Sequence, residues 1–243
     1  MPATFITSKT NTMTKNTASL PKELTAEKEA EIASMSRRKF LGFAGATSGV
    51  FLVAAACKKN NDSGLDLGSG DIGILNYAYA LEQLEAAFYT QVVASTSTGL
   101  SATEMSLFKD IRDHEVVHRE FFKAALSGNA IPSLDVDFSS INFGSRDSIL
   151  ATAKAFEDLG VSAYNGAGRL LQSADYLTLA GKIVSVEARH AAYIRDIISN
   201  GSFADNTVVD ASGLDVVRTP NEVLSIAGTY IKTQINASNL PTS

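Results

Sequence analysis

Two short stretches decide the fold, Glu115-Val116-Val117-His118 and Glu187-Ala188-Arg189-His190. Residues three apart lie on the same face of an α-helix, so the Glu and the His of each stretch can reach toward one point. The chain has three histidines, and two of them stand three residues after a glutamate. We therefore interpret the two stretches as the ligand-bearing parts of two helices that share a metal site.

The surrounding sequence repeats this pattern with a second element. Glu82 precedes Tyr89 by seven residues, and Glu157 precedes Tyr164 by seven. The repeat relates Glu82 to Glu157 over 75 residues, and Glu115 to Glu187 over 72 residues. The second half of the chain therefore repeats the first in spacing as well as in residue type.

Apolar residues recur every three or four positions in four segments, which predicts four long helices. We expect them at residues 71–94, 101–127, 147–173 and 175–199. Residues 128–146 contain proline and glycine and lack a helical period, so they predict a long crossover between the second and third helices. Thr219-Pro220-Asn221-Glu222 predicts a shorter fifth helix that runs to about residue 235. The expected fold class is an all-α four-helix bundle with an extra C-terminal helix.

At Leu81–Tyr89 and Phe156–Tyr164 the chain resembles the ferritin-like superfamily, in particular exported bacterial proteins related to desiccation-associated proteins. The resemblance covers about residues 71–235 and implies a site for two metal ions, with iron favoured over manganese. It implies that Glu82 and Glu157 are terminal carboxylate ligands and that Glu115 and Glu187 are bridging ones. The nitrogen ligands it implies are His118 and His190. It also implies that Tyr89 and Tyr164 hydrogen-bond to ligand carboxylates.

Two neighbouring residues leave alternatives open. Glu85 shares the inward stripe of the first helix with Glu82, so either residue can be its ligand. The seven-residue spacing to Tyr89 favours Glu82, and Glu85 then lies at the bundle seam or pairs with a base. His114 points roughly 100° away from Glu115 around its helix, so we expect it at the surface or behind a ligand.

The N-terminal segment is typical of an export signal. Ser36-Arg37-Arg38 leads into the moderately apolar run of residues 41–56, and the paired arginines resemble the twin-arginine type. Ala54-Ala55-Ala56-Cys57 resembles a lipobox, although Ala54 stands where Leu is preferred, so Cys57 is the candidate lipidation site. We expect residues 1–57 to be the signal, with Met35 as a candidate start, residues 58–70 a polar tether and residues 71–243 the folded domain.

Composition and charge limit the function. Downstream of residue 56 the chain has 14 Lys and Arg against 22 Asp and Glu, so nucleic acid is not an expected partner. We expect a periplasmic or cell-envelope protein that reaches the membrane only through a lipid at Cys57. Its centre would react with dioxygen or peroxide, oxidising ferrous iron or removing peroxide. The alternative is a non-catalytic module for metal sequestration or for a structural role in stress protection.

Overall fold

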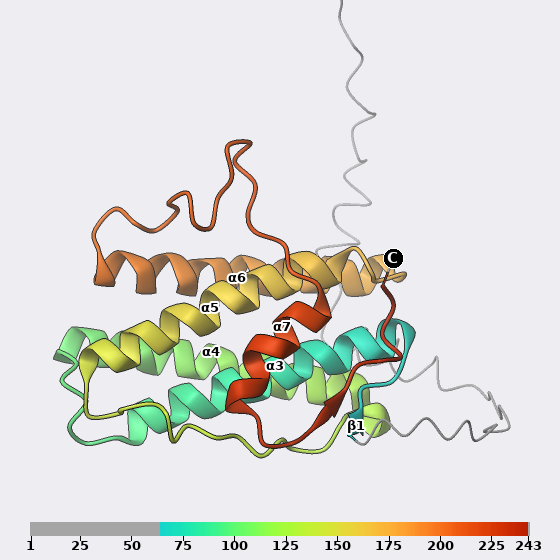
Figure 1. The fold of residues 1–243 in the computed structure, drawn as a ribbon, viewed down its shortest axis with the longest axis horizontal. Coiled ribbons are helices and arrows are strands. Elements are labelled where there is room, and N and C mark those ends of the chain that lie inside the picture. The colour runs from blue at the N-terminus through green and yellow to red at the C-terminus, as the bar shows by residue number, and fades with distance from the viewer. Residues whose placement is uncertain (1–63, 243) are drawn as a thin grey trace, which may run out of the picture. The chain divides into compact units, whose positions relative to one another are not determined.

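The computed structural model describes residues 64–242, and four long helices form its body (Figure 1). They are α3 (Gly70–Ala94), α4 (Ala102–Leu126), α5 (Arg146–Gly168) and α6 (Ala174–Ile198). Helix α3 packs along α4, α5 packs along α6, and α3 contacts α5 between the two pairs. The predicted all-α bundle is confirmed. The paired arginines, Met35 and Cys57 lie outside the described residues.

Side-chain caps fix where the helices begin. Ser101 and Glu104 form a capping box at the start of α4, in which each side chain accepts a hydrogen bond from the other residue's backbone N–H. Ser145 and Ser173 cap α5 and α6 in the same way with their hydroxyls. These three helices start within one residue of their expected positions, and so does α3, whose N-cap residue Ser69 makes no side-chain capping hydrogen bond.

The end of α5 differs from the prediction, because the helix stops at Gly168 and does not continue to residue 173. The carboxylate of Asp71, at the start of α3, accepts hydrogen bonds from the backbone N–H groups of Gln172 and Ser173. These two bonds hold residues 169–173 as a turn. A contact with a residue 101 positions away thus decides this boundary.

Helix α3 is buried on nearly all sides, because the crossover covers the part that the other helices leave open. Asn76 donates to the carbonyls of Leu67 and Asn129 and accepts from the N–H of Ile131. Seven residues further along α3, Gln83 accepts a hydrogen bond from the N–H of Leu134 at 2.8 Å. Two amide side chains therefore satisfy the backbone of the crossover where it crosses α3.

The helix in the C-terminal region is shorter than expected. Helix α7 (Pro220–Ala227) is followed by the 3-10 turn η2 (Gly228–Tyr230), and a second 3-10 turn, η1 (Ser127–Asn129), follows α4. Beyond η2 the chain is extended: Ile231 bridges Val136 of the crossover, and β2 (Ile235–Asn236) pairs in parallel with β1 (Leu65–Asp66). Backbone pairing thus replaces the last predicted helical turns, and part of the segment expected to be a tether forms a strand.

The loop of residues 199–219 is fastened to the bundle by one buried arginine. Arg195 of α6 pairs with Asp158 of α5 at 2.6 Å and with Asp205 of the loop at 2.7 Å. At its far end the loop crosses α5, where the N–H of Arg218 donates to the carbonyl of Ser162.

Within residues 64–242, no helix combines the length and the apolar character needed to cross a membrane.

The crossing over α5 requires glycine at position 166, because a Cβ there would overlap the carbonyl oxygen of Arg218. We expect Gly166→Ala to lower the free energy of unfolding by about 1–3 kcal/mol, the usual cost of overpacking. Gly181→Ala is the matched control, since its Cβ would meet no atom within 4 Å. It should raise the free energy by up to about 1 kcal/mol. Urea denaturation of the metal-free proteins measures both, and equal shifts would contradict the crossing.

Candidate metal centre

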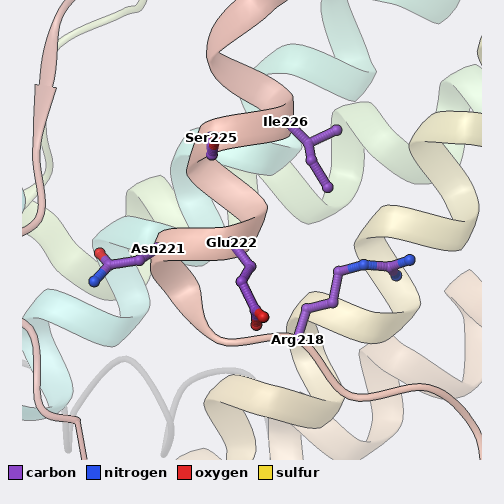
Figure 2. Close-up of a pocket in the computed structure, with 5 residues that line it drawn as sticks. All are labelled: Arg218, Asn221, Glu222, Ser225 and Ile226. Carbon is purple, nitrogen blue, oxygen red and sulfur yellow. The ribbon is translucent and has the colours of Figure 1, made fainter.

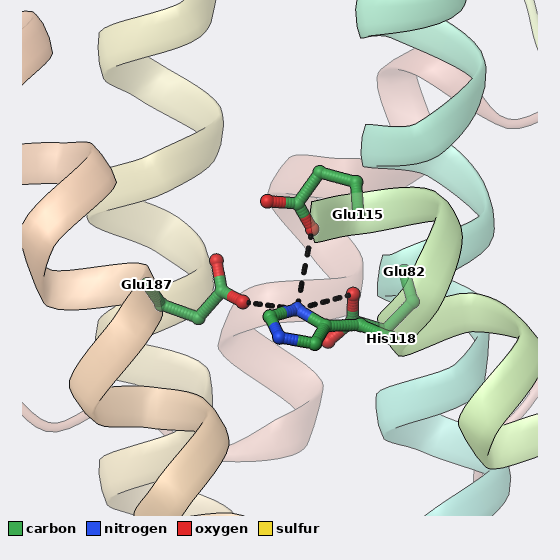
Figure 3. A group of neighbouring side chains, drawn as sticks. All are labelled: Glu82, Glu115, His118 and Glu187. Atoms are coloured by element: carbon green, nitrogen blue, oxygen red, sulfur yellow. Dashed lines mark ion pairs between the residues drawn. The ribbon is translucent and has the colours of Figure 1, made fainter. Parts of the chain in front are cut away.

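The six predicted ligands lie together in the middle of the bundle, each helix contributing from its buried face. Helices α3 and α5 supply one glutamate each, and α4 and α6 supply a glutamate and a histidine each. Figure 3 shows four of the six converging on one point. The side chains of Glu82, Glu115, Glu157 and Glu187 have no exposed surface, so the centre is shielded from bulk water.

The ligand atoms form two groups that share two glutamates. In the first, His118 Nδ1 lies 2.8 Å from Glu187, 3.5 Å from Glu82 and 3.7 Å from Glu115 (Figure 3). In the second, His190 Nδ1 lies 2.9 Å from Glu115, 3.5 Å from Glu187 and 3.6 Å from Glu157.

Within each group the candidate ligand atoms all lie within 4.8 Å of one another. Two such groups with two common carboxylates have the arrangement of a two-metal site in a ferritin-like bundle.

The orientation of these atoms fits metal ions better than direct hydrogen bonds. Eight buried atoms of the six ligands make no hydrogen bond, among them Nδ1 of both histidines and both oxygens of Glu115 and Glu187. The two nitrogens lie 2.8 and 2.9 Å from carboxylate oxygens of Glu187 and Glu115 without forming a hydrogen bond. Buried polar atoms without partners are costly, and ions at the two points of convergence would satisfy them.

Two tyrosines bind the terminal carboxylates across the bundle. Tyr89 of α3 donates to Glu157 of α5 at 2.5 Å, and Tyr164 of α5 donates to Glu82 of α3. Each bond uses the oxygen that its glutamate does not direct at a histidine. The tyrosines therefore fix the orientation of the two carboxylates and leave one oxygen of each for an ion.

The protonation of the centre without metal reflects burial and crowding. Burial raises the pKa of Glu82, Glu115 and Glu157 above the usual range. Burial also acts on Glu187, but the two histidines beside it outweigh that effect and lower its pKa. The pKa of His118 is lowered by burial but raised overall to about 12 by the adjacent carboxylates. Protons thus neutralise the cluster in the absence of ions.

Glu85 is buried beside the centre but belongs to neither ligand group. The repeat relates position 85 to Gly160, and a Cβ at position 160 would lie 2.9 Å from Glu85 Oε1. Gly160 therefore leaves room for this carboxyl group. Burial, and then the charges of the four ligand glutamates, hold the pKa of Glu85 well above its usual range.

His114 lies behind a ligand, which is one of the two positions expected for it. Its Nδ1 lies 2.9 Å from Nε2 of His190, and the two rings are stacked with an interplanar angle of 10°. The comparison with Glu115 placed His114 on another face of α4. Its spacing of four residues from His118 was the better signal, because residues four apart share a helix face.

A surface hollow elsewhere offers no competing site. Arg218, Asn221, Glu222, Ser225 and Ile226 line it beside α7 (Figure 2). Its single carboxylate is engaged in capping α7, where Glu222 accepts a hydrogen bond from the N–H of Thr219. This hollow therefore lacks a set of metal ligands.

Glu85 gives the metal-free protein a testable pH dependence. Its pKa is higher in the folded state than in the unfolded state, so the folded protein retains a proton that the unfolded protein releases. The stability that this carboxyl group contributes is therefore fully present below its pKa in the unfolded state and is lost as pH rises through its pKa in the folded state. Glu85→Gln resembles the protonated form at every pH. We expect this variant to unfold at higher urea concentration than the wild type at about pH 8, and to lose less stability between about pH 5 and about pH 8.

Glu120→Gln is the matched control, because Glu120 lies on the exposed side of α4. It should leave the slope of stability against pH unchanged. If Glu85→Gln gave the wild-type slope, Glu85 would not be the buried protonated carboxyl described above.

Comparisons with known proteins agree with this geometry. The family model described as a ferritin-like domain matches residues 70–200, which include all six ligands. A search of curated proteins returns no match to the chain. The match covers more than half of the chain and spans the four helices that supply the ligands. The chain therefore belongs to the ferritin-like domain family.

Proposed function

We propose that the protein binds two metal ions and uses them in redox chemistry with dioxygen or peroxide. The observation that carries this proposal is the pair of ligand groups that share Glu115 and Glu187. In this proposal Glu115 and Glu187 would serve both ions, while Glu82 and His118 would complete one position and Glu157 and His190 would complete the other. Four carboxylates and two neutral imidazoles would balance the charge of two divalent cations.

The donor set favours iron over manganese. Carboxylates suit both metals, and imidazole suits iron and similar transition metals. When bound, a pair of such ions supplies a Lewis-acidic and redox-active centre. The proposed substrates are ferrous iron, with oxidation by dioxygen, or peroxide. Which of them reacts depends on what reaches the buried centre.

The side chains around the centre would exclude water, orient the ligands and hold a proton. The fully buried glutamates keep bulk water from the ligand atoms, and the hydrogen bonds from Tyr89 and Tyr164 hold two carboxylates in place. Glu85 is the one buried carboxyl group of this region outside both ligand groups, and its raised pKa keeps a proton there. A proton store beside a redox centre suits the reduction of an oxygen species.

The proposed setting is the cell envelope. Arg37-Arg38 and the apolar run after them resemble an export signal, and Cys57 is the proposed lipid attachment point. These residues support a periplasmic location, with lipid as the only link to the membrane. The relation to exported, desiccation-associated proteins is also part of this proposal.

The ligand roles can be separated by metal loading. We expect purified protein to bind two ferrous ions per chain under reducing, anaerobic conditions, and fewer manganese ions at equal concentration. Glu115→Ala should weaken both positions, whereas Glu82→Ala and Glu157→Ala should each weaken mainly one. The loss should exceed about 100-fold in affinity, because removing a ligand costs more than removing its outer partner.

Equilibrium dialysis with metal analysis measures this loading, and Glu120→Ala on the exposed side of α4 serves as the control. If wild-type protein loaded neither iron nor manganese, the proposed function would be wrong. Equal losses from all three glutamate variants would contradict the division into bridging and terminal ligands.

Catalysis and sequestration are distinguished by consumption of the oxidant. Iron-loaded protein should consume dioxygen or peroxide at a rate that Glu115→Ala abolishes. Oxygen-electrode and peroxide assays on the loaded protein measure this rate. Protein that loads two ions but consumes neither oxidant would support the alternative, a module that sequesters metal.

A further inference from the structure

The two halves of the metal centre differ in what lies behind their histidines. Nε2 of His190 lies 2.9 Å from Nδ1 of His114. The 72-residue repeat relates His114 to Val186, whose side chain cannot accept a hydrogen bond. Within residues 64–242, no hydrogen bond joins the outer nitrogen of His118 to another residue. The approximate symmetry of the ligands is therefore broken directly behind them.

The protonation of the His190 ring follows from its two neighbours. Nδ1 of His190 faces Glu115 and the second ligand group, so a metal ion there takes the lone pair of Nδ1. The proton of the neutral ring must then sit on Nε2, which donates to Nδ1 of His114. His114 in turn carries its own proton on Nε2, because its Nδ1 accepts. One hydrogen bond thus selects the tautomer of His190 that binds metal through Nδ1.

The same bond fixes the ring in place. His114 and His190 stack with centroids 5.1 Å apart, and the side chain of His190 is 5 % exposed. The side chain of His118 is 12 % exposed and has no such partner on its outer side. Outer hydrogen bonds of this kind orient a histidine ligand, raise its basicity and change metal affinity by about 10–100-fold.

We propose that His114 is a positioning residue that makes the metal position at His190 the tighter of the two, so that the first ion binds there. The inference rests on the proposed two-metal function and extends it by assigning an order of loading. The ion at His118 is the second to bind and the first to leave, and exchange with solution takes place at that position.

Titration with cobalt(II) alone tests this order, since the d–d absorption of the bound ion reports its ligands. The wild type should bind two ions in separate steps. His118→Ala should retain the tighter step and His190→Ala should lose it. His114→Ala should weaken the tighter step by about 10–100-fold and leave the weaker step unchanged. His114→Asn should recover most of the loss, because Asn Oδ1 stands where Nδ1 of His114 accepts.

Val117→Ala is the matched control, since Val117 is an exposed, neutral residue of the same helix. It should bind cobalt as the wild type does. Because His114 is itself exposed, the metal-free His114→Ala protein should still unfold in one cooperative urea transition, so that a weaker cobalt step reports metal affinity and not loss of the fold.

Three results would overturn the inference while leaving the two-metal proposal intact. They are a His114→Ala titration that matches the wild type, equal weakening of both steps, and a His114→Asn protein no better than His114→Ala. Retention of the tighter step in His190→Ala, with its loss in His118→Ala, would reverse the proposed order. Wild-type protein that binds no cobalt, iron or manganese would overturn both proposals together.

Discussion

The structure depends on burying four carboxylates at one level of a helical bundle. Isolated charges there would be too costly, so every neighbouring feature helps to neutralise or orient them. Two histidines approach from α4 and α6, and two tyrosines hold the outer carboxylates from the opposite helices. The unpaired ligand atoms that remain converge on two points. The bundle is therefore organised around charge as much as around its apolar core.

The surroundings of the centre are less symmetrical than its ligands. Glu85 has Gly160 opposite it, and His114 corresponds to Val186. Both differences place an additional polar group in the first half of the chain, behind or beside a ligand. The repeated helical pair thus has the same candidate ligands in both halves and different residues around them, so the two ligand groups lie in different environments.

Helical period and ligand spacing allowed most of the fold to be predicted from the sequence. The four long helices and the register of Glu115, His118, Glu187 and His190 depend on residues three and four apart, and these are local relations. The alternative between Glu82 and Glu85 required the structure, although the alignment of Glu85 with Gly160 was already visible in the repeat. The end of α5 and the short C-terminal helix depend on Asp71 and on pairing of Ile231 with Val136, contacts that cross about 100 residues. Periodicity carries no information about such contacts.

The tyrosine bonds that cross from α3 to α5 have a consequence for assembly. Each helical pair, α3 with α4 and α5 with α6, is joined by contacts between helices that are consecutive in the chain, whereas the two pairs meet only through contacts between distant segments. One pair alone would offer a single Glu-x-x-His with one further glutamate, a set that binds copper or zinc more tightly than iron by the general order of affinities. The complete geometry exists only once the pairs have docked and each tyrosine has reached the glutamate of the other half. In the proposed two-metal function, discrimination between metals would therefore depend on the docking of the two pairs, and an ion bound before docking would meet only part of the ligand set.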